Sequence, residues 1–256
     1  MQRLSAHSAH DKDTLNVVVI LGSGPKAGQA AEWDARFWSQ LVVINNAWRI
    51  RSDWDACVFP EDFPDENRPL NPASNQRLIQ AEHFVPHQNR FGGVVYAGGT
   101  MIFTTAYWAL GALKPDVMAF FGCDLVYPES GPTHFYGTGA PDPLRKDVTL
   151  QSLEAKAARL QLIAAKNRCV CLNLSSDGSR LVFPRTTLHN LSEVEWIEPN
   201  REAIDQVLMC ERTLGYRVPS GRYWECFEQL DADALASIDA LWLEAHAICQ
   251  PAGQTA

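Results

Sequence analysis

The chain enters its first predicted strand and turn at Asn16-Val-Val-Val-Ile-Leu-Gly-Ser-Gly-Pro-Lys-Ala-Gly28, where an unbroken apolar run meets a glycine-rich segment. The mostly β-branched residues at 17–21 predict a strand buried on both faces, as in a parallel sheet covered by helices. Gly22 and Gly24 permit a sharp turn that brings backbone N–H groups close to a ligand, and Pro25 suits the first helical position. A helix N-terminus favours anions, so this stretch predicts a phosphate-containing ligand.

The glycines fit the loose dinucleotide-binding pattern G-x-G-x-x-A through Gly22, Gly24 and Ala27. That pattern also expects an acidic residue about 20 positions further on, at the end of the second strand. The second predicted strand ends instead at Asn45 and Asn46, whose neutral side chains can hydrogen-bond a ribose or a base. The spacing of a Walker A motif is absent. A nucleotide is therefore the expected ligand, and an ordinary βα turn without a ligand is the alternative.

Length and composition are those of an ordinary globular protein. The 256 residues suffice for one large domain or a domain with an appendage, and 46% of them are hydrophobic. No apolar run reaches the roughly 18 residues of a membrane span, and the polar N-terminus lacks the apolar core of a signal peptide. The seven cysteines are scattered without paired C-x-x-C spacing. A reducing cytoplasm without disulfides is therefore expected.

The formal net charge of −8 comes wholly from the last quarter of the chain. Residues 1–189 contain 18 Lys or Arg and 18 Asp or Glu, whereas residues 190–256 contain 4 and 12. No basic face is visible, so binding to nucleic acid is not expected. The acidic segment is predicted to form a solvated helical face, through which the chain could meet a protein partner or a second copy of itself.

Alternating apolar runs and amphipathic stretches predict an α/β protein with a Rossmann-like, mostly parallel, doubly wound sheet. After the first strand, the predicted strands are 41–45, 55–59, 116–124 and 169–174, with shorter ones at 83–86 and 93–97, and the predicted helices are 98–111 and 152–166. From about residue 190 the pattern becomes helical. The expected division is a disordered polar tail over 1–15, a nucleotide-binding domain over 16–189 and an acidic helical extension over 190–256.

Polar residues follow the predicted strands, and the carboxyl ends of parallel strands meet at one edge of a sheet. These candidates are Gly22, Ser23, Gly24, Pro25, Asn45, Asn46, Glu61, Asp62, Gly98, Gly99, Thr100, Cys123 and Asp124. Gly98, Gly99 and Thr100 offer a second anion cradle, with close packing of a helix on a strand as the alternative. The asparagines and Asp124 could equally cap a turn or a helix.

The long connection over 125–148 is rich in proline and glycine, and loops of this length are often lids over active sites. Its His134 is the candidate general base because histidine titrates near neutrality; an exposed histidine without a role is the alternative. The same loop supplies candidates for stabilising a phosphate group, which are Tyr127, Tyr136, Arg145 and Lys146.

Together these segments resemble a set of bacterial and archaeal proteins: the small sialyltransferases that use CMP-sialic acid, the motility-associated nonulosonate transferases and the 6-hydroxymethylpterin diphosphokinase-like proteins. The resemblance covers about residues 16–185 and lies in Gly22-Ser-Gly-Pro25, Ile44-Asn-Asn46, Gly98-Gly-Thr100, Ala109-Leu-Gly111, Gly122-Cys-Asp124 and Thr133-His-Phe-Tyr-Gly137. It implies that Ser23 and Asn46 contact the ribose and the base, and that residues 98–100 contact the phosphate or the donor sugar. This chain has Ser23 where such sialyltransferases have asparagine, and Thr138 where they have a second lid histidine that resembles the catalytic base.

Three functions follow as expectations. The first is a glycosyltransferase-like enzyme that uses a nucleotide-activated sugar, with a CMP-sugar favoured, His134 as base and no required metal. The second is an ATP-dependent diphosphokinase acting on a small alcohol such as a pterin, with Mg²⁺ at Asp62 or Asp124. The third, to which Thr138 points, is a catalytically silent nucleotide-binding or scaffold protein that engages a partner through its acidic helices.

Overall fold

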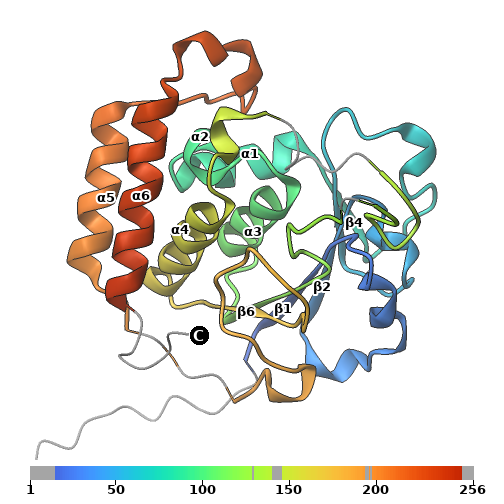
Figure 1. Ribbon diagram of the computed structural model, residues 1–256. Coiled ribbons are helices and arrows are strands. Elements are labelled where there is room, and N and C mark those ends of the chain that lie inside the picture. Colours follow the sequence, from blue (N-terminus) through green and yellow to red (C-terminus); the bar gives the residue numbers. More distant parts are fainter. Residues whose placement is uncertain (1–14, 129, 140–145, 194–195, 197, 250–256) are drawn as a thin grey trace, which may run out of the picture.

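Six parallel strands form one sheet in the computed structural model, which describes residues 15–128, 130–139, 146–193, 196 and 198–249 (Figure 1). Their order across the sheet is β4-β3-β2-β1-β5-β6, and each neighbouring pair is parallel. The strands are β1 Val17–Leu21, β2 Gln40–Ile44, β3 Ala56–Val58, β4 Arg77–Ile79, β5 Val117–Phe121 and β6 Val170–Asn173. The predicted α/β, Rossmann-like class is confirmed.

Helices cover one face of this sheet, and short 3-10 helices and loops cover the other. The α-helices are α1 Ala81–Arg90, α2 Val94–Ala97, α3 Met101–Ala112, α4 Leu153–Lys166, α5 Arg201–Leu214 and α6 Ala232–Cys249. The 3-10 helices are Ala27–Glu32, Ala35–Phe37, Asn45–Arg49, Asp65–Asn67, Val148–Leu150, Leu188–Asn190, Tyr223–Glu225 and Phe227–Gln229. Among the described helices, none combines the length and the apolar character needed to cross a membrane.

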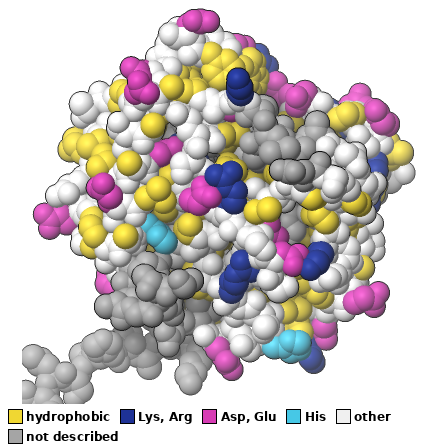
Figure 2. Space-filling model, in the orientation of Figure 1, with side chains coloured by type: hydrophobic (Ala, Val, Ile, Leu, Met, Phe, Trp, Pro, Cys, Tyr) yellow, Lys and Arg dark blue, Asp and Glu magenta, His cyan; other side chains and the backbone are white. Residues whose placement is uncertain are grey.

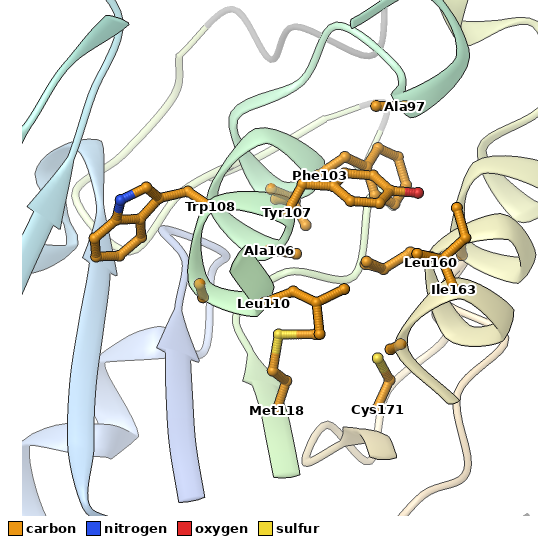
Figure 3. Close-up of a cluster of buried hydrophobic side chains, with 14 of the residues drawn as sticks. Ala97, Phe103, Ala106, Tyr107, Trp108, Leu110, Met118, Leu160, Ile163 and Cys171 are labelled. Carbon is orange, nitrogen blue, oxygen red and sulfur yellow. The ribbon is translucent and has the colours of Figure 1, made fainter. Parts of the chain in front are cut away.

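The alternation of side chains along β1 divides the core into two layers. Val18 and Ile20 pack beneath the α-helices, while Val17, Val19 and Leu21 pack beneath the 3-10 segments on the opposite face. Helix α3 lies directly on the sheet, and ten of its twelve residues are buried, as its uniformly apolar sequence predicts. Figure 3 shows its side chains between Met118 of β5 and Leu160 and Ile163 of α4.

Three sequence expectations for local structure were wrong. Residues 83–86 lie in helix α1 instead of a strand, because its buried residues Phe84 and Gln88 recur at helical spacing. Residues 94–97 form helix α2 and not the expected strand. Strand β4 was missed, since it is a three-residue edge strand whose first residue is exposed. The helix expected to start at Pro25 is a 3-10 helix of six residues that begins at Ala27.

The C-terminal helices pack on α4 rather than on the sheet, so that α4 lies between α6 and the strands (Figure 1). Their apolar faces join the core of the helical layer through Ile204, Leu235, Ile238 and Trp242. Asn200 caps α5 by accepting a hydrogen bond from the backbone N–H of Ala203. The helical pattern predicted beyond residue 190 is therefore present, and its apolar stripe belongs to the main core.

Candidate functional site

A cavity of about 1180 Å³ lies at the carboxyl ends of the strands. The chain leaves β1 toward β2, β3 and β4 on one side and returns to β5 on the other, and such a switch point leaves a crevice between diverging loops. The predicted site residues that line it are Gly22, Ser23, Gly24, Pro25, Asn45, Glu61, Asp62, Gly99, Thr100, Cys123, Asp124, Tyr127, His134, Tyr136 and Lys146. Asn46 and Gly98 are not in this lining, and Arg145 lies outside the described residues.

The glycines after β1 are needed for contact between two turns. The N–H of Gly22 donates to the carbonyl of Phe121 at 2.8 Å, and that of Gly24 donates to the carbonyl of Gly122 at 2.9 Å. A Cβ placed on Gly22 would lie 2.4 Å from the carbonyl oxygen of Gly122. The N–H groups of Gly22 and Gly24 are therefore engaged by carbonyls of the neighbouring turn, and anion binding by this turn stays a prediction. The short 3-10 helix that follows also lacks the aligned dipole of a longer α-helix.

The second glycine turn, at 98–100, is likewise explained by packing. The N–H of Gly98 donates to the carbonyl of Val94 at 2.9 Å, and that of Gly99 donates to Thr149 Oγ1 at 3.0 Å. A Cβ on Gly99 would lie 2.1 Å from the hydroxyl oxygen of Tyr223. The predicted cradle of free N–H groups at these two glycines was therefore wrong. The neighbouring Thr100 caps α3, and its hydroxyl accepts from the N–H of Phe103.

Two buried side-chain oxygens of the lining lack a hydrogen-bond partner among the described residues. They are Oδ1 of Asn45 and Oδ1 of Asp124. Asn45 follows β2 in the left-handed region, with φ of 50°, which asparagine tolerates better than most residues. An unpaired buried acceptor costs about 1–3 kcal/mol. Both oxygens are themselves shielded from solvent, so a ligand in the cavity can donate to either of them only after that side chain turns toward it. Asn46 Oδ1 is also buried without a partner, outside the lining.

His134 is held by the loop that closes over the glycine turn. Its backbone N–H and carbonyl pair with Gly137 in a tight turn, and the N–H of Phe135 donates to the carbonyl of Ser23 at 3.1 Å. The imidazole stacks on Tyr136 with 4.9 Å between ring centroids, and its Nδ1 lies 2.9 Å from Thr133 Oγ1. Burial lowers the pKa of His134, so the ring is neutral at pH 7 and can accept a proton.

Charges around the cavity are mixed. Lys26 pairs with Asp177 at 2.6 Å, and Arg222 pairs with Glu61 at 3.1 Å. On the face drawn in Figure 2, Lys and Arg side chains lie among acidic and hydrophobic ones without a continuous basic patch. Within the described part of the chain, no three His, Cys, Asp or Glu side chains are grouped as they would be around a metal. A Mg²⁺ ion at Asp62 or Asp124 would therefore take its other ligands from water and substrate phosphates.

The sequence prediction missed the contribution of the connection between α5 and α6. Its Arg222, Tyr223, Trp224 and Phe227 all line the cavity, although this segment was expected to be a solvated face. The Tyr223 hydroxyl donates to Asp147 Oδ2 at 2.6 Å. The available signal was the aromatic run Tyr223-Trp224 after Gly221 in a polar stretch between two helices, because loops often contribute binding residues.

Searches of protein-family models, of curated proteins and of solved structures found no match to this chain. The resemblance to CMP-sialic-acid-dependent transferases therefore stays a prediction. What the protein does has to be argued from the chemistry of the cavity and its lining.

Proposed function

We propose that this cavity binds a nucleotide-activated sugar, with a CMP-sugar favoured, and that the protein transfers the sugar to an acceptor hydroxyl. The observation that carries the proposal is the pair of unpartnered buried oxygens on Asn45 and Asp124 at the switch point of the sheet. A ribose has hydroxyl donors and cytosine has an amino donor, so a cytidine nucleotide can satisfy both acceptors. The cavity is large enough for such a ligand and lies at the place in the sheet where ligands of α/β proteins bind.

The proposed general base is Nε2 of His134. Thr133 Oγ1 accepts from the N–H of Gly139 at 2.8 Å, and its own hydrogen can point to the carbonyl of Gly139 at 3.3 Å. With those bonds made, the hydroxyl oxygen also accepts Nδ1–H, which leaves Nε2 unprotonated. The tautomer is assigned from this network. Among the described residues Nε2 has no hydrogen-bond partner.

Transfer would form a bond from the acceptor oxygen to the sugar and break the bond from the sugar to the phosphate. The acceptor proton moves to His134 Nε2, and the nucleotide leaves as a phosphate whose charge needs stabilisation. Tyr127, Tyr136 and Lys146 line the cavity and are assigned this role, together with Arg145 on sequence grounds. Asp124 orients the substrate through its unpaired oxygen.

The second candidate, diphosphate transfer from ATP, is supported by the presence of both Asp62 and Asp124 in the same lining. Two carboxylates can hold Mg²⁺ together with substrate phosphates. The two proposals differ in their need for a metal, because sugar transfer as proposed uses only side chains of the protein.

Thermal shifts with CMP, CDP, UDP, GDP, ATP and NAD, each with Mg²⁺ or with a chelator, separate these proposals. A ligand at 100 times its Kd adds about 2.7 kcal/mol of stability. We expect CMP to raise Tm regardless of metal, and Asp124→Asn to weaken CMP binding while Asp205→Asn on α5 does not. A shift by ATP that requires Mg²⁺ would favour diphosphate transfer, and no shift with any nucleotide would overturn both proposals.

Release of CMP from CMP-sialic acid then tests the reaction itself. We expect the wild-type chain to release CMP faster in the presence of an acceptor and His134→Ala to lose this activity. Binding of CMP without any turnover would instead identify the silent nucleotide-binding protein to which Thr138 points.

A further inference from the structure

The connection between α5 and α6, residues 215–231, is held across the cavity by contacts to distant parts of the chain. Asn89 Nδ2 of α1 donates to the carbonyl of Pro219 at 2.8 Å, and Arg222 pairs with Glu61 beyond β3 at 3.1 Å. Both contacts join this connection to elements near the carboxyl edge of the sheet. The connection therefore forms one wall of the cavity and is held in place by these contacts.

Two further contacts set this wall close to the rest of the lining. The hydroxyl of Tyr223 donates to Asp147 Oδ2 at 2.6 Å and lies so close to Gly99 that no Cβ would fit there. Gly221 is also close to Val85, since a Cβ on Gly221 would lie 2.8 Å from Cγ2 of that valine. The wall therefore faces α1 and the turn before α3.

This wall contains three aromatic side chains, Tyr223, Trp224 and Phe227. Tyr223 is buried, whereas Trp224 is 56% exposed and Phe227 is 42% exposed. Both exposed rings meet Tyr223 at steep angles, with centroid distances of 5.7 Å to Trp224 and 5.5 Å to Phe227. Aromatic side chains are typical of the linings of ligand-binding pockets.

The facing part of the lining is also apolar. Its apolar residues are Ala81, Phe84, Val85, Val94, Met101 and Ile102. Its polar side chains Gln88 and Thr104 bond to each other at 3.2 Å. This region and the aromatic wall together form the apolar half of the cavity, whereas Asn45, Asp124 and His134 belong to the polar half.

We propose that the apolar half is the acceptor subsite and that the acceptor is a hydroxyl compound with an apolar body, an aryl or an alkyl group. The inference rests on the proposed function, because the polar half then holds the nucleotide sugar beside His134. An acceptor made only of sugar hydroxyls would leave those hydroxyls that face the aliphatic and aromatic side chains without partners. An apolar body is instead removed from water by Trp224, Phe227 and the facing aliphatic side chains.

Binding of 8-anilinonaphthalene-1-sulfonate, a dye that fluoresces in apolar sites, provides the test. We expect Trp224→Ala and Phe227→Ala each to weaken dye binding at least tenfold. Trp196→Ala is the matched control, since Trp196 is 51% exposed and not in the cavity lining. Far-UV circular dichroism establishes that each variant is folded. Unchanged dye affinity in both folded cavity variants would overturn the proposal.

Competition with three alcohols identifies the apolar body. We expect 2-naphthalenemethanol or 1-octanol, but not glycerol, to displace the dye, and the more effective of the two distinguishes aryl from alkyl acceptors. Displacement by glycerol alone, or by none, overturns the proposal. The CMP thermal shift is measured on the same variants. If CMP does not raise the Tm of the wild-type chain, the nucleotide-sugar proposal is wrong. If CMP raises the Tm but neither the dye nor an apolar alcohol binds, only the proposed acceptor subsite is wrong.

Discussion

At the scale of single residues, Gly22 lets the turn after β1 lie against the turn after β5 because it lacks a Cβ. We expect Gly22→Ala to lower the free energy of unfolding by about 2–3 kcal/mol, since overpacking in a close contact has such a cost and the new carbon would meet Gly122 and Cys123 Sγ. Gly28→Ala is the control, because a Cβ at Gly28 has no neighbour within 4 Å. Urea unfolding measures both, and equal effects would contradict the packing argument.

His134 makes a prediction about pH. Burial lowers its pKa below the ordinary value of about 6.5, and only the neutral ring can take a proton. We therefore expect the transfer rate to rise with pH through a midpoint below 6.5 and then to level off. His134→Ala is expected to lower the rate by about 100-fold or more while keeping the CMP thermal shift. His189→Ala, an exposed histidine outside the cavity, is the control, and a midpoint above 6.5 would contradict this role.

Much of the candidate site could be predicted from the sequence, but the hydrogen-bond partners of some of its residues could not. Asn45 and Asp124 could be found because polar residues after apolar runs mark strand ends in a parallel sheet. Whether an N–H at Gly22 or Gly99 is free depends on which distant carbonyl or hydroxyl comes near it. That information lies in tertiary contacts between residues about 100 positions apart, such as Gly22 and Phe121, and not in the local pattern.

At the scale of elements, long apolar runs were the reliable signal. Strand β1 has the predicted bounds, and β5 lies within its predicted run. Strand β4 was missed because it has only three residues. Residues 83–86 were assigned to a strand but lie in α1, which contains Pro86, a residue that is unfavourable inside a helix. The segment after β1 forms a six-residue 3-10 helix that contains Gly28, and glycine weakens an α-helix at an interior position.

Helix α4 holds α5 through a buried ion pair that we expect to be critical for stability. Arg159 contacts both carboxylate oxygens of Glu211 at 2.7 and 2.9 Å, with almost no exposure of either side chain. Glu211→Gln leaves the guanidinium charge buried without its counter-ion, so we expect a loss of about 3–5 kcal/mol in unfolding free energy.

The matched control for Glu211→Gln is the same substitution in an arginine–glutamate ion pair that is exposed to solvent. Arg180 binds Glu154 through two hydrogen bonds of 2.7 and 2.8 Å, but both side chains are 40% exposed. Glu154→Gln should therefore cost less than about 1 kcal/mol. Chemical denaturation of both variants decides the point, and a similar loss in the two would show that burial is not what makes the first pair important.

Helix α6 should make stability depend on pH through His246. Burial lowers the pKa of this histidine, whose Nε2 lies 2.9 Å from Gln161 Oε1 of α4. Between the lowered folded pKa and about 6.5, the unfolded chain binds more protons, so stability falls as pH falls through that window. The effect cannot exceed about 1.4 kcal/mol per pH unit for one proton.

Urea unfolding of the wild-type chain and of His246→Gln between pH 5 and pH 8 isolates this contribution. We expect the stability difference between wild type and variant to shrink on acidification, since the variant has no proton to take up at this position. A difference that stays constant across the window would exclude His246 as the cause.

At the scale of the whole molecule, the C-terminal helices complete both the core and the cavity. Without them, buried Lys156 and Arg159 of α4 would lose Asp239 and Glu211, their carboxylate partners. The aromatic wall that contains Tyr223 and Trp224 would be lost as well. The charge distribution suggests a division at residue 189. This division separates two compositions and not two folding units, because ion pairs and core contacts join residues on both sides of it.

We accordingly expect a chain ending at residue 189 to be unfolded or aggregated, although that boundary was predicted to enclose a nucleotide-binding domain. The full chain should unfold in one cooperative urea transition, with tryptophan fluorescence and circular dichroism giving the same midpoint. The shared apolar core of α4 with Ile204, Leu235 and Trp242 is the physical reason. Two separate transitions in the full chain, or a shortened chain that unfolds cooperatively and keeps the CMP thermal shift, would instead show that residues 16–189 fold and bind on their own.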